Sequence, residues 1–205
     1  MKKLFYLILF FAYAVSCVSA QNMRTLFLNA PDVVFPLLTK NCRADLVDFI
    51  EAGMKAQVNN KLDGVSVLEE LDDDYLNLST TASSSVQLKL LPVNGDSIIC
   101  VVRTVKAEAA DSRIYFYDRS WNLLNADGKF QTPSIRDFFI SPSDADELVD
   151  ICDIYLVAFA LSADNETLVA EYTMPAYMNI DDAKKVALLL RKLTYRWNGE
   201  RFVIE

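Results

Sequence analysis

The chain has 205 residues, of which 20 are lysine or arginine and 28 are aspartate or glutamate, so its formal net charge is −8. Such an acidic chain is poorly suited to bind nucleic acid or an anionic membrane surface. It contains no histidine, which excludes histidine-dependent nucleophiles and histidine-containing zinc sites. Because 52% of its residues are hydrophobic, the chain can form a buried core and is not disordered by composition.

The first twenty residues have the pattern of a secretory signal peptide. Lys2 and Lys3 are followed by an uncharged apolar run, residues 4–15, which is too short to span a membrane. Small or apolar residues then occupy the positions before a cleavage site. We expect cleavage between Ala20 and Gln21.

The mature chain would span residues 21–205. We expect a single domain without a transmembrane span, exported to the periplasm or secreted. A weak lipoprotein motif at Cys17 leaves lipidation there as an alternative. In an oxidising compartment, Cys100 and Cys152 could form a disulfide, although Cys42 is also present and connectivity does not follow from sequence.

Two helices are predicted near the start of the mature chain. Asn29 is a candidate N-cap of a short helix that carries Pro31 in its first turn. Asn41 can cap a second helix, near residues 43–58, in which apolar residues recur mostly at helical spacing. Gly53 weakens the interior of this helix slightly.

From Val65 onward the pattern becomes typical of strands, with short turns between them such as Asn94-Gly95-Asp96. Short turns of this kind favour an antiparallel meander. The predicted strands in this part of the chain are residues 75–80, 86–90, 98–105 and 112–118, and residues 119–135 are a predicted loop.

The last third of the chain alternates helices with hairpins. Ser141 and Asn179 are predicted N-caps, and Asn198-Gly199 between two apolar runs is the strongest hairpin signal in the chain. The predicted helices are residues 142–150 and 180–190, and the predicted strands are residues 152–162, 166–174, 193–197 and 201–204.

These elements predict an α+β fold. A mostly antiparallel sheet of successive hairpins would pack against amphipathic helices near residues 43–58, 142–150 and 180–190. The order of helices followed by hairpins occurs twice in the chain. A fold of two loosely similar halves that share one sheet is therefore an alternative.

Carboxylates are the only abundant catalytic groups. Asp72-Asp73-Asp74 and the acids of residues 144–153 form two clusters, but neither has the spacing of a calcium-binding loop. The chain has no glycine-rich phosphate loop and no CxxC motif. We therefore predict no cofactor, no metal site and no catalytic residue. A carboxylate-based hydrolase acting on glycan or peptidoglycan remains the alternative.

Charge and aromatic side chains gather on one predicted strand and at its exit. We identify five candidate binding residues there, for an envelope protein or a glycan, against the alternative that they only pack in the core and sheet. They are Asp111, Arg113, Tyr115, Tyr117 and Trp121.

Four stretches resemble an uncharacterised family, domain of unknown function 3256, which occurs in exported proteins of Bacteroides-type gut and oral bacteria. They are residues 22–27, residues 31–39, the helix that starts at Arg43-Ala44-Asp45, and residues 111–121. The resemblance covers the whole mature chain and implies a secreted or periplasmic domain, with no established activity to transfer. The function we expect is a non-catalytic binding or interaction domain of the bacterial envelope.

Overall fold

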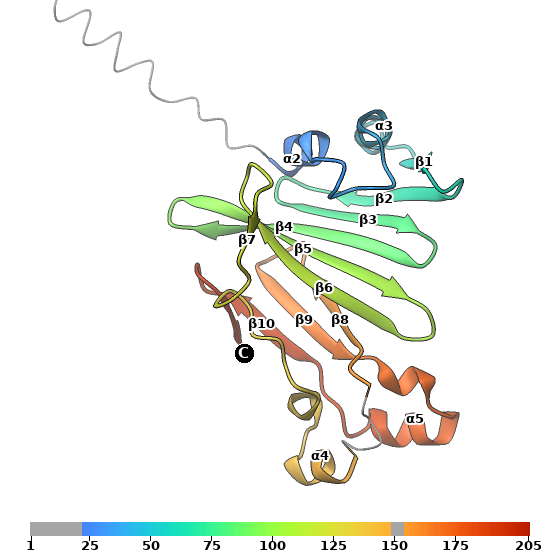
Figure 1. The fold of residues 1–205 in the computed structure, drawn as a ribbon, viewed down its shortest axis with the longest axis vertical. Helices are drawn as coiled ribbons and strands as arrows, with labels where there is room; N and C mark the ends of the chain where they lie inside the picture. Colours follow the sequence, from blue (N-terminus) through green and yellow to red (C-terminus); the bar gives the residue numbers. More distant parts are fainter. Residues whose placement is uncertain (1–21, 149–153) are drawn as a thin grey trace, which may run out of the picture.

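The computed structural model describes residues 22–148 and 154–205. The predicted signal peptide, its cleavage site at Ala20 and Gln21, Cys17 and Cys152 lie outside the described residues. The fold is α+β, as predicted, and is mostly antiparallel sheet with few helices (Figure 1). None of the helices in the two described ranges is long and apolar enough to cross a membrane.

Within the described residues, the strands form two antiparallel sheets rather than one. The first has seven strands in sequential order and the second has four in the order β11-β10-β9-β8, so the predicted meander of hairpins is confirmed. The alternative of two halves that share one sheet, which the sequence left open, does not hold in these residues, because the second set of hairpins pairs only with itself. The strands are β1 (Gln57–Asn59), β2 (Val65–Leu71), β3 (Tyr75–Thr81), β4 (Ser84–Val93), β5 (Asp96–Lys106), β6 (Ala110–Tyr117), β7 (Leu123–Leu124), β8 (Val157–Leu161), β9 (Thr167–Tyr172), β10 (Leu193–Trp197) and β11 (Phe202–Ile204).

The α-helices are α2 (Met23–Asn29), α3 (Lys40–Glu51), α4 (Pro142–Leu148) and α5 (Ile180–Ala187), and two 3-10 helices are η1 (Ile135–Phe138) and η2 (Met174–Tyr177). The predicted helix start at Asn29 is wrong, because α2 ends there. The Asn22 side chain caps α2 by accepting from the backbone N–H of Thr25, and Pro31 prevents the helix from continuing.

Helix α3 also differs from the prediction at both ends. Thr39, rather than Asn41, caps its N-terminus by accepting from the N–H of Cys42 at 3.1 Å. The helix ends at Glu51 rather than at residue 58, because Gly53 takes a left-handed conformation with φ 67°. Val58 consequently lies in strand β1.

Later parts of the chain also differ from the sequence prediction. Strand β8 begins at Val157 rather than at residue 152, because Val157 pairs with Tyr172, the last residue of its partner strand. Helix α5 ends at Ala187 rather than at residue 190, because Leu190 instead forms an antiparallel bridge with Phe139. The predicted loop of residues 119–135 contains the short strand β7.

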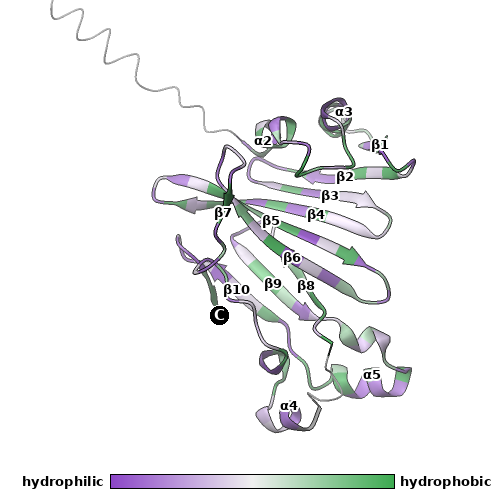
Figure 2. Ribbon diagram, in the orientation of Figure 1, coloured by the Kyte–Doolittle hydropathy of each residue, from purple (hydrophilic) through white to green (hydrophobic). Residues whose placement is uncertain are grey.

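The seven-stranded sheet is covered on both faces, and its strands carry both hydrophobic and hydrophilic stretches (Figure 2). One face packs against α2, α3 and the segment between them. The buried residues there include Leu26, Phe27, Phe35, Leu46, Leu76, Leu78, Leu88 and Val101. The other face packs against the four-stranded sheet, where the buried residues include Tyr75, Val102, Phe116, Phe159, Tyr195, Trp197 and Phe202.

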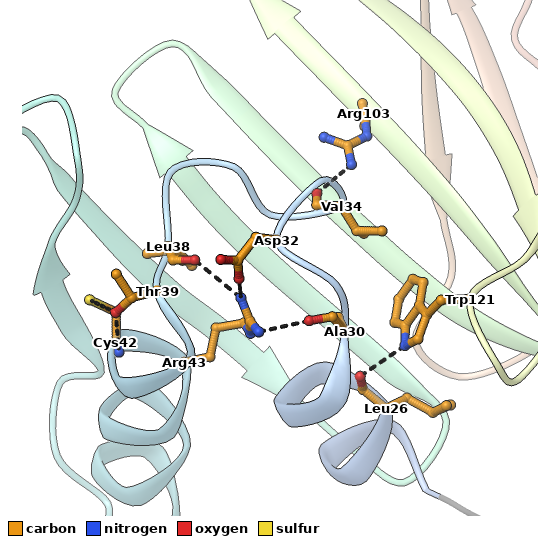
Figure 3. A network of polar contacts seen from close by, with 10 residues as sticks. All are labelled: Leu26, Ala30, Asp32, Val34, Leu38, Thr39, Cys42, Arg43, Arg103 and Trp121. Carbon is orange, nitrogen blue, oxygen red and sulfur yellow. Dashed lines mark hydrogen bonds and ion pairs between the residues drawn. The ribbon is translucent and has the colours of Figure 1, made fainter.

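Arg43 fixes the segment between α2 and α3 from inside the core. Its side chain is only 2% exposed and donates to the carbonyl oxygens of Ala30 at 2.7 Å and Leu38 at 3.1 Å. It also pairs with Asp32 at 3.2 Å (Figure 3). These bonds satisfy buried carbonyl groups of an irregular segment, which otherwise have no helix or strand partner.

Side chains of the large sheet complete the outer edge of β8, which crosses its face. The N–H of Phe159 donates to Ser112 Oγ at 3.0 Å, and the N–H of Leu161 donates to Gln87 Oε1 at 3.0 Å. The buried Lys89 ammonium donates to the Ala163 carbonyl at 2.7 Å. Three backbone groups at the free edge of the small sheet are therefore satisfied by side chains of the large one.

Candidate functional site: a pocket at the edge of β6

The structure separates the five predicted binding residues into two groups. Trp121 is only 9% exposed, and its indole Nε1–H donates to the Leu26 carbonyl at 3.2 Å (Figure 3). Its ring packs on those of Tyr117 and Phe35. Tyr115 and Tyr117 lie partly buried against the same core. Trp121 therefore belongs to the packing under α2 and does not form an exposed aromatic platform.

Asp111 and Arg113, the other two candidates, line a pocket of about 210 Å³ at the edge of β6. Its apolar part contains the buried rings of Phe116 and Phe159. The remaining lining residues are Ser112, Ile114, Ala126, Phe130, Thr132 and Tyr155.

Among the residues that the structure describes, none forms a strand along the edge of β6 in this pocket. Strand β7 pairs with β6 only at Phe116 and Tyr117, and the chain then turns away at Gly128, which has φ 78°. The stretch from Asp111 to Tyr115 is consequently paired on one side only, with β5.

The direction of the backbone groups on this edge follows from the register. Lys106 pairs with Ala110, yet the N–H of Lys106 donates to Ser83 on the β4 side, and the carbonyl of Ala110 accepts from Thr173. Ala110 therefore points its backbone groups away from β5. Because backbone direction alternates along an antiparallel strand, Ser112 and Ile114 also direct their N–H and C=O groups into the pocket.

These backbone groups have no hydrogen-bond partner in the part of the chain that the structure describes. Ser112 is only 5% exposed, so the groups lie in a sheltered place. Buried backbone donors and acceptors are nearly always paired with protein, water or ligand. The edge therefore offers a short row of main-chain donors and acceptors to whatever enters the pocket.

The charged residues that line the pocket are Asp111 and Arg113. Arg113 is exposed and lies directly opposite Arg103 on β5. The Arg103 guanidinium donates to the Val34 carbonyl, and neither arginine takes part in an ion pair among residues 22–148 and 154–205. Like charges opposite one another across a strand pair repel. An anion at Arg113 would relieve this repulsion.

Tyr155 closes one side of the pocket. Its hydroxyl donates to the Pro133 carbonyl at 3.0 Å. Burial raises the pKa of Tyr155 to about 12, and the negative charges of Asp111 and Asp137 also raise it. The positive charge of Arg113 lowers the Tyr155 pKa. All three charged side chains therefore lie close enough to act on this hydroxyl.

We expect Tyr155→Phe to weaken the loss of stability at high pH. The Tyr155 pKa rises from 10 in the unfolded chain to about 12 in the folded protein, so between these values only the unfolded state loses its proton. Stability is therefore fully present below the unfolded pKa and falls as the pH rises towards the folded one. The pKa values of Tyr75 and Tyr195 are also raised to about 12, so in Tyr155→Phe the fall in stability should become shallower without disappearing. Denaturant unfolding of the unmodified protein and of Tyr155→Phe between about pH 9 and pH 12 measures how steeply the free energy of unfolding falls. An equally steep fall in both proteins would contradict the raised pKa of Tyr155.

Several acidic side chains that line the other cavities are already engaged. Glu51, near Asp72 and Asp73, pairs with Arg24 at 2.6 Å. Glu171 pairs with Lys192 at 2.7 Å, and Asp137 accepts from the N–H of Ser134 at 2.7 Å. Within the described residues, no three Asp, Glu or Cys side chains gather closely enough to hold a metal ion.

Cys100 lies on the face of β5 between the two sheets. It is completely buried, its thiol is free in the structure, and burial raises the pKa of that thiol. Cys152 lies outside the described residues, so the disulfide between the two stays a prediction.

Sequence reasoning found Asp111 and Arg113 but missed the residues that complete the pocket. Phe130, Tyr155 and Phe159 lie in other elements, and no spacing in the sequence connects them with β6. The available signal was the short turn-rich stretch after β7, which shows where the pairing of β6 stops.

Comparison with known proteins identifies relatives but no activity. The model of a family described as "Protein of unknown function (DUF3256)" matches residues 15–202. The chain is similar to a solved structure of a domain of an uncharacterised protein from Porphyromonas gingivalis W83. The two are 28% identical with a TM-score of 0.77, and the match covers 91% of this chain and 98% of the other. None of the curated proteins matches the chain.

Proposed function

The chain belongs to the DUF3256 family of proteins of unknown function, and we propose that it is a non-catalytic binding domain that holds an extended segment of a partner protein against the edge of β6. The observation that carries this proposal is the unpaired stretch from Asp111 to Tyr115, whose outward backbone groups face a pocket. Addition of a peptide strand to an exposed sheet edge is a recurrent mode of recognition.

The pocket has the composition that this mode requires. Main-chain groups of Ser112 and Ile114 can bond to any extended peptide, while the apolar lining can accept a side chain. The incoming strand would continue the line of β7, which occupies the adjacent positions of the same edge. A hydrolase acting on glycan is less well supported, since several acids that line cavities are held by arginine, lysine or backbone groups.

We place this activity outside the cytoplasm. The support is the pattern of the first twenty residues, in which two lysines precede a short apolar run and a cleavage site. The partner would accordingly be a protein of the bacterial envelope.

The proposal is tested with the mature protein, residues 21–205, on an immobilised library of random decapeptides. The variant Ile114→Pro removes one outward N–H without removing a bond to β5, a position where a strand tolerates proline. Loss of one such bond, about 1–1.5 kcal/mol, should weaken peptide binding about tenfold.

The matched control is Ile204→Pro, which changes an outward position on the edge strand β11 of the other sheet. It should leave peptide binding unchanged. If the library shows no binding, or if both variants bind like the unmodified protein, strand addition at β6 is not the function. Binding in a parallel glycan array, without peptide binding, would favour the glycan alternative.

A further inference from the structure

The slot beside β6 is closed at both ends. At one end, β7 occupies the edge at Phe116 and Tyr117. At the other end, the Thr173 hydroxyl donates to the Ala110 carbonyl at 2.5 Å. The open stretch between them is roughly 17 Å long at about 3.4 Å per residue. A chain that passes through would have to leave the edge at both ends, whereas a chain terminus needs only one exit.

Strand direction and an arginine without an ion pair distinguish between the two kinds of terminus. A segment that runs antiparallel to β6, as β7 does, would end near Asp111 with its C-terminus. Arg113 and Arg103 lie opposite one another without an ion-pair partner in the described residues. Asp111 lies on the same face, two residues from Arg113, and is the acid of β6 that lines the pocket. Among the residues that line the pocket, Arg113 is the one guanidinium, so it is the group that can meet an anion there. A guanidinium binds a carboxylate through two parallel N–H···O bonds.

The size of the pocket agrees with a terminus. A volume of about 210 Å³ is small for a ligand site. It suits one apolar side chain, and the rings of Phe116, Phe130 and Phe159 line it. In an added strand, alternate side chains point to the same face, so a single side chain near the end would enter.

We infer that the β6 pocket binds the free C-terminal end of a partner polypeptide. The terminal carboxylate pairs with Arg113, the main chain bonds to Ser112 and Ile114, and an apolar side chain near the terminus packs on the rings. The bound segment runs antiparallel to β6, as β7 does, with its end directed towards Asp111. This inference rests on the proposed strand addition, and it adds the chemical identity of the end that is recognised.

The experiment compares three forms of each decapeptide that binds the mature protein in the library. One form has a free C-terminal carboxylate, one has a C-terminal amide, and one carries the same sequence followed by further residues. Affinities are measured for the unmodified protein, for Arg113→Gln and for the control Arg196→Gln. Arg196 is an exposed arginine on β10 that pairs with Glu205, so the control makes the same charge change away from the pocket.

The inference expects the free acid to bind more than tenfold more tightly than the amide and the extended form. Arg113→Gln should abolish this preference, whereas Arg196→Gln should preserve it. Equal binding of the three forms, or a preference that survives in Arg113→Gln, overturns recognition of the carboxylate and leaves strand addition standing. If no form binds, strand addition itself fails, and the inference fails with it.

Discussion

Replacing Trp197 by alanine should lower the free energy of unfolding by about 4 kcal/mol. Trp197 is only 6% exposed and packs on the rings of Phe116 and Phe202, with centroids 6.2 and 5.2 Å away. Its indole Nε1–H also donates to the Pro92 carbonyl at 2.8 Å. The residue therefore joins the small sheet to the large one through both apolar contact and a hydrogen bond. Denaturant unfolding followed by circular dichroism measures the loss.

The control variant Trp197→Phe separates the two contributions. It keeps an aromatic ring between the sheets but leaves the Pro92 carbonyl without its donor, so a loss of about 1–2 kcal/mol is expected. If Trp197→Ala and Trp197→Phe lost similar amounts, the hydrogen bond rather than the packing would dominate. A loss below about 1 kcal/mol in Trp197→Ala would contradict the burial of this ring between the sheets.

Replacing Arg43 by alanine should lower the free energy of unfolding by about 3 kcal/mol. The carbonyl groups of Ala30 and Leu38 would each lose a donor in a buried place, and an unsatisfied buried acceptor costs about 1–3 kcal/mol. The aliphatic part of the side chain would also leave the core, where Arg43 is 2% exposed. Urea unfolding of the variant measures the effect.

Asp32→Asn is the matched control for Arg43. It weakens the ion pair with Arg43 but leaves both carbonyl bonds, and the Asp32 side chain is 66% exposed. An ion pair whose carboxylate lies mostly in solvent contributes little to stability, so Asp32→Asn should lower the free energy of unfolding by less than about 1 kcal/mol. A control that lost as much as Arg43→Ala would show that the ion pair, and not the two carbonyl bonds, holds the segment between α2 and α3.

The strand pattern was predictable because it depends on short-range alternation and turns. Asn94-Gly95 and Asn198-Gly199 form hairpin turns as predicted, with positive φ at both glycines. The division into two sheets was not predictable in the same way. Alternation of Gln87 and Lys89 with leucines is typical of a strand with one solvent-facing side. Here the second sheet covers that side, and both polar groups bond to its backbone.

The sequence predicted the starts of helices wrongly where two nearby residues could each serve as the N-cap. Asn22 and Asn29 stand at the two ends of the six residues 23–28, and both are good cap residues, so the local pattern does not decide which one begins a helix. Thr39 and Asn41 compete in the same way at the start of α3. The decision depends on which segment can bury its apolar face, and that is a property of the tertiary structure.

The candidate site was predicted in part for a similar reason. Asp111 and Arg113 stood out because they are charged residues on an aromatic strand, and they line the pocket. Trp121 stood out for its size, but its ring lies under α2, where its indole bonds to Leu26. The open edge itself has no residue signature, because it depends on where the two-residue strand β7 stops.

The central claim is that a peptide adds to the edge of β6, and amide hydrogen exchange at β6 tests it most directly. In the free protein, the amides of Arg113 and Tyr115 should be protected by β5, and those of Ser112 and Ile114 should exchange faster. On saturation with a decapeptide selected from the library, Ser112 and Ile114 should become protected. Protection that develops elsewhere while these two amides keep exchanging would contradict strand addition at β6.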